Sequence, residues 1–188
     1  GRGNYQASKM EQLADKGNGN FAYIDSILEA QKVLVKQMGG TLVAVAKDVK
    51  IQVEFNPTQV KGYRLLGYEN RILAAQDFSD DKKDAGELGA GHTVTVLYEI
   101  IPAGSTEPIP GIDALKYQKT KLTDAANASE MMTVKLRYKK PTGTKSTLLS
   151  QPLVDDDIKL TKTSNAFRFS AAVVQAALVL RDSKHKGQ

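Results

Sequence analysis

The stretch YRLLGYENRILAAQDFSDDKKDAGELGAGHTVTVLYE, residues 63–99, decides the fold class because it joins two apolar runs through an acidic connection that contains glycines. Residues 63–68 and 93–101 are rich in aliphatic and aromatic side chains, whereas Asp, Gly and Lys dominate the connection between them. Short apolar runs with such boundaries are typical of β-strands. The stretch therefore predicts two strands, but it contains no arrangement of residues that identifies a reaction.

Strict alternation on either side of this stretch predicts more sheet. Over residues 49–55 the apolar positions are Val49, Ile51, Val53 and Phe55, which alternate with Lys50, Gln52 and Glu54. Over residues 131–139 the polar positions are Thr133, Lys135, Arg137 and Lys139. A period of two predicts amphipathic strands with one solvated face. The basic face of the second run is interpreted as solvated or as a charged edge, with an anionic-ligand surface as the alternative.

Helical patterns occupy the two ends of the chain. We predict a helix from an Asn4 cap to about Lys16, a short strand at Phe21–Ile24, and a helix that begins at a Ser26/Glu29 capping box and ends at Gly39. A last helix follows a Ser164 cap, and its wide apolar arc predicts burial on most sides. Residues 102–130 are expected to form an irregular surface connection with a helical turn near 112–117.

The order of these elements predicts an α+β fold. An N-terminal helix-strand-helix is expected over residues 1–40, followed by an antiparallel β-sandwich-like domain over residues 41–188, including a short strand at 145–149 after a turn at 141–143. The C-terminal helix is expected to close that domain.

Four segments carry a resemblance to a known family. They are Asn56-Pro57, YRLLGYENR at 63–71, DFSDDKKDAGELGAGHTVTVLYE at 77–99 and FRFSAAVVQAALVLR at 167–181. Together they resemble the C-terminal domain of bacterial von Willebrand factor A-domain proteins of the YfbK type. Residues 3–34 resemble the last helix, strand and helix of the A domain itself. The residues that define this family motif, mostly as architecture, are Tyr63, Arg64, Gly67, Tyr68, Glu69, Asn70, Gly86, Gly89 and Gly91.

The resemblance implies a function without catalysis. It implies a structural or protein-interaction module that supports a metal-dependent, partner-binding A domain in a protein of the cell envelope, with a periplasmic or lipid-anchored parent. The Asp-x-Ser-x-Ser metal motif of A domains does not occur in this sequence. Mg²⁺ or Ca²⁺ is therefore expected only in the part of the A domain outside it, and the chain is interpreted as a fragment. The expected partners are that A-domain body and an unknown protein.

Composition narrows the remaining classes of function. The chain has 188 residues, a net charge of +5 and no cysteine, so disulfides, thiolate zinc sites and cysteine nucleophiles are excluded. The sequence contains no nucleic-acid-binding motif, no Gly-x-Ser-x-Gly elbow and no apolar run long enough to span a bilayer. We therefore expect neither an enzyme nor a nucleic-acid partner.

The acidic connection leaves one alternative open. Carboxylate clusters suit hard cations, so a ligand-binding module for a divalent metal or a carbohydrate is the competing hypothesis. The candidate metal ligands are Asp77, Asp80, Asp81, Asp84, Glu87 and His92. Their spacing does not match an EF-hand, and a structural loop with exposed charges is the interpretation that the sequence favours.

Overall fold

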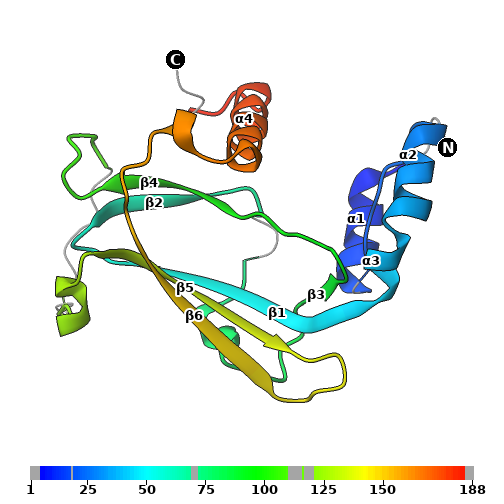
Figure 1. Ribbon diagram of the computed structural model, residues 1–188, viewed down its shortest axis with the longest axis horizontal. Coiled ribbons are helices and arrows are strands. Elements are labelled where there is room, and N and C mark those ends of the chain that lie inside the picture. The colour runs from blue at the N-terminus through cyan, green and yellow to red at the C-terminus, as the bar shows by residue number, and fades with distance from the viewer. Residues whose placement is uncertain (1–4, 18, 69–71, 110–115, 117–120, 185–188) are drawn as a thin grey trace. The chain divides into compact units, whose positions relative to one another are not determined.

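The computed structural model describes residues 5–17, 19–68, 72–109, 116 and 121–184 (Figure 1). Its strands are β1 (Ala44–Phe55), β2 (Val60–Leu66), β3 (Gly86–Gly89), β4 (Leu97–Pro102), β5 (Glu130–Lys139) and β6 (Ser146–Val154). Its α-helices are α1 (Ala7–Lys16), α2 (Ile27–Gln31), α3 (Met38–Leu42) and α4 (Asn165–Leu180). A π-helical turn at Lys32–Lys36 connects α2 to α3, and short 3₁₀ helices lie at Ala75–Phe78, Asp124–Asn127 and Leu160–Lys162.

The strands form two antiparallel sheets, which confirms the predicted α+β fold class. One sheet has four strands in the order β3-β1-β5-β6, and the other pairs β2 with β4. In the smaller sheet Arg64 lies opposite Glu99 and Leu66 opposite Leu97. Strand β3 was not predicted, because its four residues, Gly-Glu-Leu-Gly, carry no periodic apolar signal.

The chain divides into two compact units, each made of three segments. Unit 1 contains residues 1–52, 73–94 and 135–150, and unit 2 contains residues 53–72, 95–134 and 151–188. Strands β1, β5 and β6 therefore each supply residues to both units. The predicted domain boundary near residue 40 stays a prediction.

Asn56 holds together the first two segments of unit 2. Its side-chain amide donates hydrogen bonds to three backbone carbonyls, those of Ala126 (3.1 Å), Ala128 (3.3 Å) and Glu130 (2.9 Å). Its side-chain oxygen accepts from the backbone N–H (3.1 Å) and hydroxyl (2.8 Å) of Thr58. An amide that donates and accepts in this way fixes both the turn after β1 and the approach to β5, which explains the asparagine at this position.

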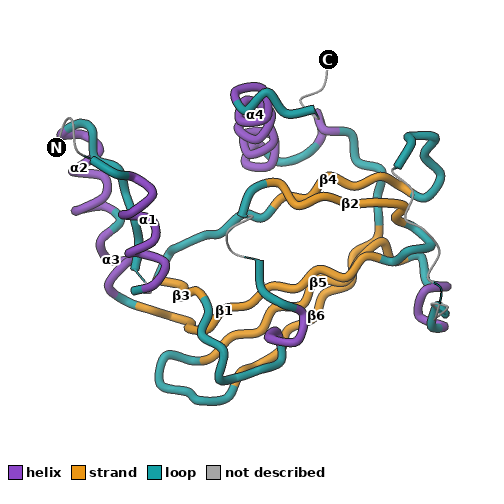
Figure 2. Tube along the Cα trace, turned by 180° about the vertical axis from the view of Figure 1, so that it is seen from behind, coloured by secondary structure: helices purple, strands orange, loops and turns teal. Residues whose placement is uncertain are grey.

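Helix α4 lies beside the β2-β4 sheet within unit 2 (Figure 2). The Ser164 hydroxyl accepts from the Phe167 N–H at 3.1 Å, which confirms the predicted cap. The prediction of burial on most sides was wrong, because no residue of α4 is buried and Phe169 and Leu180 are 72% and 87% exposed. Only one narrow face, which includes Ala171, Val174 and Leu178, is half-buried.

The N-terminal segment departs from the prediction in two ways. The Ser26 hydroxyl caps α2 as predicted, but the helical run is broken by the π-helical turn. The predicted strand at Phe21–Ile24 is not formed, because no neighbouring strand in the described part of the chain supplies hydrogen-bond partners. Instead Tyr23 packs edge-on against Tyr5, with ring centroids 5.1 Å apart. The predicted Asn4 cap and the predicted helical turn near 112–117, apart from Lys116, lie outside the described residues.

Replacement of Asn56 by Ala is predicted to destabilise unit 2. The substitution removes the donor for three carbonyls, and half-buried carbonyls without a partner cost roughly 2 kcal/mol in unfolding free energy. Urea denaturation measures this loss. The matched control is Asn127→Ala, at an exposed asparagine of the same region, which we expect to change stability by less than about 0.5 kcal/mol. Equal losses in the two variants would contradict the role assigned to Asn56.

Candidate functional site

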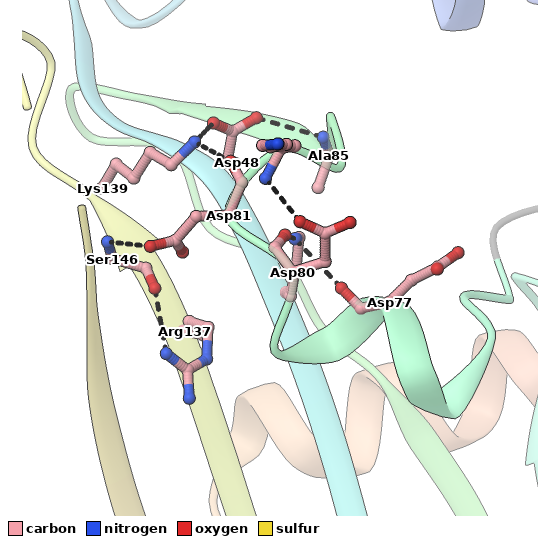
Figure 3. A network of polar contacts seen from close by, with 10 residues as sticks. Asp48, Asp77, Asp80, Asp81, Ala85, Arg137, Lys139 and Ser146 are labelled. Carbon is pink, nitrogen blue, oxygen red and sulfur yellow. Dashed lines mark hydrogen bonds and ion pairs between the residues drawn. The ribbon is translucent and has the colours of Figure 1, made fainter. Parts of the chain in front are cut away.

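The candidate site is a polar network in unit 1 that connects all three of its segments (Figure 3). It begins with an irregularity in β1, where the register with β3 shifts between Ala46 and Val49. Asp48 lies in this bulge with a φ of 50°, a left-handed conformation that Asp tolerates better than most residues. The bulge directs the Asp48 carboxylate toward Lys139 (2.6 Å) and the backbone N–H of Ala85 (3.2 Å).

Two lysines form the centre of the network. The Lys50 ammonium donates to the backbone carbonyls of Asp77 (3.1 Å) and Asp80 (2.5 Å). The Lys139 ammonium donates to Asp48 and to the Asp81 carbonyl, both at 2.6 Å. These lysines are only 4% and 8% exposed. The prediction that they belong to solvated strand faces was therefore wrong, because the acidic connection covers them and supplies the acceptors that allow their burial.

Arg137 makes the second contact between β5 and the connection. Its guanidinium lies 5.5 Å from the centre of the Phe78 ring and donates to the Ser146 hydroxyl at 3.0 Å. Phe78 is 6% exposed and is one of three buried apolar residues in the described part of the chain. A cation over an aromatic face is attracted by the negative face of the ring. The basic side of β5 is thus a covered surface rather than a free site for an anion.

The predicted acidic ligands point to different partners. The Asp77 carboxylate pairs with Lys83 (3.2 Å), Asp80 accepts from the Lys82 N–H (2.8 Å), and Asp81 accepts from the Ser146 N–H (3.3 Å). Asp84, Glu87 and His92 are exposed. Among the described residues, no group of three or more His, Asp or Glu side chains is placed to hold a metal ion. The arrangement instead fastens the connection to the sheet.

Electrostatics in the network favour the charged forms of its groups. Burial opposes ionisation of Asp48, but the hydrogen bonds from Lys139 and Ala85 outweigh it and hold the pKa of Asp48 below its ordinary value of 3.8. Hydrogen bonds from the Ser146 hydroxyl and N–H likewise lower the pKa of Asp81. The hydrogen bond to Asp48 raises the pKa of Lys139 above 10.5. All three groups are therefore charged at neutral pH.

Glycine is found at the three motif positions 86, 89 and 91 for different structural reasons. Gly89 lies so close to the carbonyl of Gly40 that any side chain would collide with that backbone oxygen. Gly91 has a φ of 75°, which few other residues adopt. Gly86 pairs with Val49 across the β1-β3 ladder. These glycines shape β3 and the turn that follows it.

The other motif residues lie in unit 2. Tyr63 stacks on Phe55 with ring centroids 4.1 Å apart, and Arg64 forms an ion pair with Glu99 across β2 and β4. Burial and then the neighbouring Tyr63 raise the pKa of Tyr98 above 10.0. Gly67 and Tyr68 both have positive φ, at the turn that ends β2. Glu69 and Asn70 lie outside the described residues.

Unit 2 also contains a shallow depression of about 340 Å³ between the end of β2 and α4. It is lined by Leu65, Leu66, Gly67, Val174, Ala177 and Leu178, with Arg64, Arg181 and Ser183 at its polar side. The charge of Arg64 is already balanced by Glu99. The depression lies between the half-buried face of α4 and the end of β2. Sequence analysis could not locate it, because it depends on contacts between distant segments.

Fold and site together define an α+β protein with a network of hydrogen bonds and ion pairs in unit 1, and comparison with known proteins gives its family. The family described as "Uncharacterized protein YfbK, C-terminal" matches residues 40–188. The chain is also 41% identical over 186 residues to "Uncharacterized protein YfbK" of Escherichia coli K12. It therefore belongs to the YfbK C-terminal family, as the sequence resemblance indicated.

The match covers 98% of this chain but 31% of the E. coli protein, so the chain spans about a third of that relative's length. No solved structure matches the chain. None of the described helices is long and apolar enough to cross a bilayer.

Replacement of Lys50 by Met is predicted to loosen the acidic connection. Met fills a similar volume but donates no hydrogen bond to the carbonyls of Asp77 and Asp80, so we expect a loss of about 2 kcal/mol in unfolding free energy. Urea denaturation provides the measurement, with the exposed Lys82→Met in the same connection as control. If both substitutions leave stability unchanged, Lys50 does not hold the connection.

Stability is predicted to fall in acid partly through Asp48. Its folded-state pKa lies below the unfolded value of 3.8, so its stabilising contribution is present above pH 3.8 and is lost as the pH falls through the folded-state pKa. Asp48→Asn keeps a residue type that tolerates positive φ but removes the charge. We expect the stability difference between wild type and this variant, measured by urea denaturation, to shrink as the pH is lowered from 7 to 3. A difference that is constant with pH would contradict the ion pair.

Proposed function

We propose that this chain is a non-catalytic structural and protein-interaction module, whose N-terminal segment packs against a von Willebrand A domain within a longer cell-envelope protein. The observation that carries the proposal is the exposed apolar surface of residues 5–40. No side chain in the described part of this segment is buried. The exposed large apolar residues are Tyr5, Met10, Leu13, Phe21, Tyr23, Ile24, Ile27, Leu28, Leu34, Val35 and Met38.

Exposing such a surface to water is unfavourable in free energy for an isolated domain. Ile27 and Leu28 are 82% and 74% exposed, side by side at the start of α2. Contiguous apolar surface of this kind marks a place where another protein surface packs. The exposure at Leu34, Val35 and Met38 extends it along the π-helical turn to α3. The exposed apolar residues of this segment are therefore typical of a protein-protein interface rather than of a surface in contact with water.

The backbone of residues 21–25 supports the same proposal. These residues form neither a helix nor a strand, and they lie between α1 and α2 in the chain. An apolar segment between two helices has the element order of one helix-strand-helix unit at the edge of an α/β sheet. A sheet edge in an adjoining domain would supply the missing hydrogen-bond partners. The resemblance of residues 3–34 to the end of an A domain identifies that neighbour in this proposal.

The relative's length is compatible with such a neighbour, because the chain spans only 31% of the E. coli protein. The cell-envelope location, the adhesive role and a Mg²⁺- or Ca²⁺-dependent partner site on the A domain rest on the resemblance alone. The polar network of unit 1 supports a structural role, because its ammonium hydrogen bonds end on three of the chain's own carbonyls and on the Asp48 carboxylate. No observation favours the alternative metal or carbohydrate site, so it is not proposed.

Hydrogen exchange tests the proposal in the E. coli relative, compared with its own segment that matches this chain. We expect the backbone amides that correspond to residues 21–25 to exchange about 100-fold more slowly in the full-length protein, because they are then hydrogen-bonded within a sheet. Amides that correspond to β5 serve as the internal control and are expected to exchange equally in both. Equal exchange at 21–25 in the two proteins would show that the segment does not join a sheet, and the proposed docking would be wrong.

A further inference from the structure

The outer edge of the four-stranded sheet is formed by β6, which pairs with β5 on one side and, within the described part of the chain, with no strand on the other. This strand, STLLSQPLV, contains no charged residue, although a quarter of the chain is charged. Leu148, Leu149, Leu153 and Val154 are all between 44% and 51% exposed. An uncharged edge strand with exposed aliphatic residues can pair with another strand through its free N–H and C=O groups. Natural proteins usually prevent such pairing with charged side chains on the edge strand.

The missing N–H of Pro152 indicates which backbone groups of β6 face outward, because a proline in a paired strand turns its nitrogen away from the neighbouring strand. The Ser146 N–H donates to the Asp81 carboxylate, which does not belong to β5, and the Pro152 carbonyl accepts from the Gln151 side chain at 3.0 Å. Because backbone groups alternate in direction along an antiparallel strand, Leu148 and Ser150 also face outward. Asp81 occupies the outer N–H at one end, and Pro152 has no N–H at the other. The open window is therefore Leu148–Ser150.

We propose that the β6 edge binds a second copy of this chain in a two-fold, antiparallel pairing centred on Leu149. Only that register places the open residue Leu148 of each copy opposite Ser150 of the other. Each such pair exchanges two backbone hydrogen bonds, so both open residues are satisfied. The occupied groups at Ser146 and Pro152 then lie opposite each other, where the ladder ends. The blocked ends thus select one register among those that a neutral strand could adopt.

The side chains in this register are complementary. Leu149 packs against Leu149 of the second copy, and Thr147 lies opposite Gln151, which can hydrogen-bond to it. Lys145 precedes the strand and Asp155 follows it, so antiparallel pairing brings the lysine of each copy near the aspartate of the other. No like charges meet along the ladder, because β6 carries none. The surface is separate from the N-terminal segment, so this inference does not depend on the proposed function.

A single cysteine tests the register directly, because the chain has no cysteine of its own. In the proposed pairing the two Leu149 residues form a non-hydrogen-bonded pair, with Cα atoms about 4.5 Å apart, which suits a disulfide. Leu149→Cys is expected to form a covalent dimer under mild oxidation at least about tenfold faster than Ile158→Cys. Ile158 is similarly exposed, at 58%, but lies outside β6. Equal rates for the two variants would overturn the proposal.

Charge substitution provides an independent measurement by sedimentation velocity. Leu149→Lys and Leu149→Glu each place like charges against each other across the two-fold axis, and each is expected to raise the dimer dissociation constant about tenfold. A mixture of the two variants is expected to associate again, since opposite charges then meet. Ile158→Lys is the matched control and should associate as wild type does. A mixture that stays monomeric, or a Leu149→Lys variant that dimerises as wild type does, would overturn the pairing.

Discussion

Two ammonium groups hold the acidic connection against the sheet, and the integrity of unit 1 depends on them. Lys50 comes from β1, Lys139 from β5, and their acceptors at Asp77, Asp80 and Asp81 come from the connection. The network thus crosses all three segments of the unit. Because a buried ammonium without acceptors is very unfavourable, the connection is held in the one conformation that presents its carbonyls to both lysines. The bulge at Asp48 completes this arrangement by turning a carboxylate inward.

Much of the strand pattern could be predicted from the sequence, because alternation is a local property. Alternation predicted the strands at 49–55 and 131–139. Capping residues predicted the Ser26 and Ser164 caps, and the order of the elements predicted the α+β class. The burial of Lys50 and Lys139 could not be predicted, because alternation reports polarity and not which segment covers a face. The cover comes from residues 77–85, which are 27 and more residues away along the chain. The acidic composition of that connection was the available signal, since a basic face and an acidic loop can neutralise each other.

Two wrong expectations have a common cause. The strand at Phe21–Ile24 and the full burial of α4 were both inferred from apolar composition, which indicates that a segment needs a partner but not that the described chain provides one. In the structure residues 21–25 remain unpaired and most of α4 is exposed. Apolar composition at these positions therefore does not by itself predict burial within the described chain. The family motif was different, because Gly91 has a positive φ that its residue type suggests, whereas Asn56 and Gly89 are explained by contacts with segments distant in the sequence.

The small apolar core makes these polar arrangements decisive. Among the described residues only Ala46, Val60 and Phe78 are buried apolar residues, too few to supply the usual hydrophobic stabilisation of a chain of this length. Asn56 in unit 2 and the lysines in unit 1 therefore define the conformation of segments that packing alone would leave undetermined. Such hydrogen bonds specify geometry more than they add stability. The apolar residues that the core leaves exposed, such as Ile27, Leu28 and Leu149, therefore contribute little to the stability of the described chain by itself.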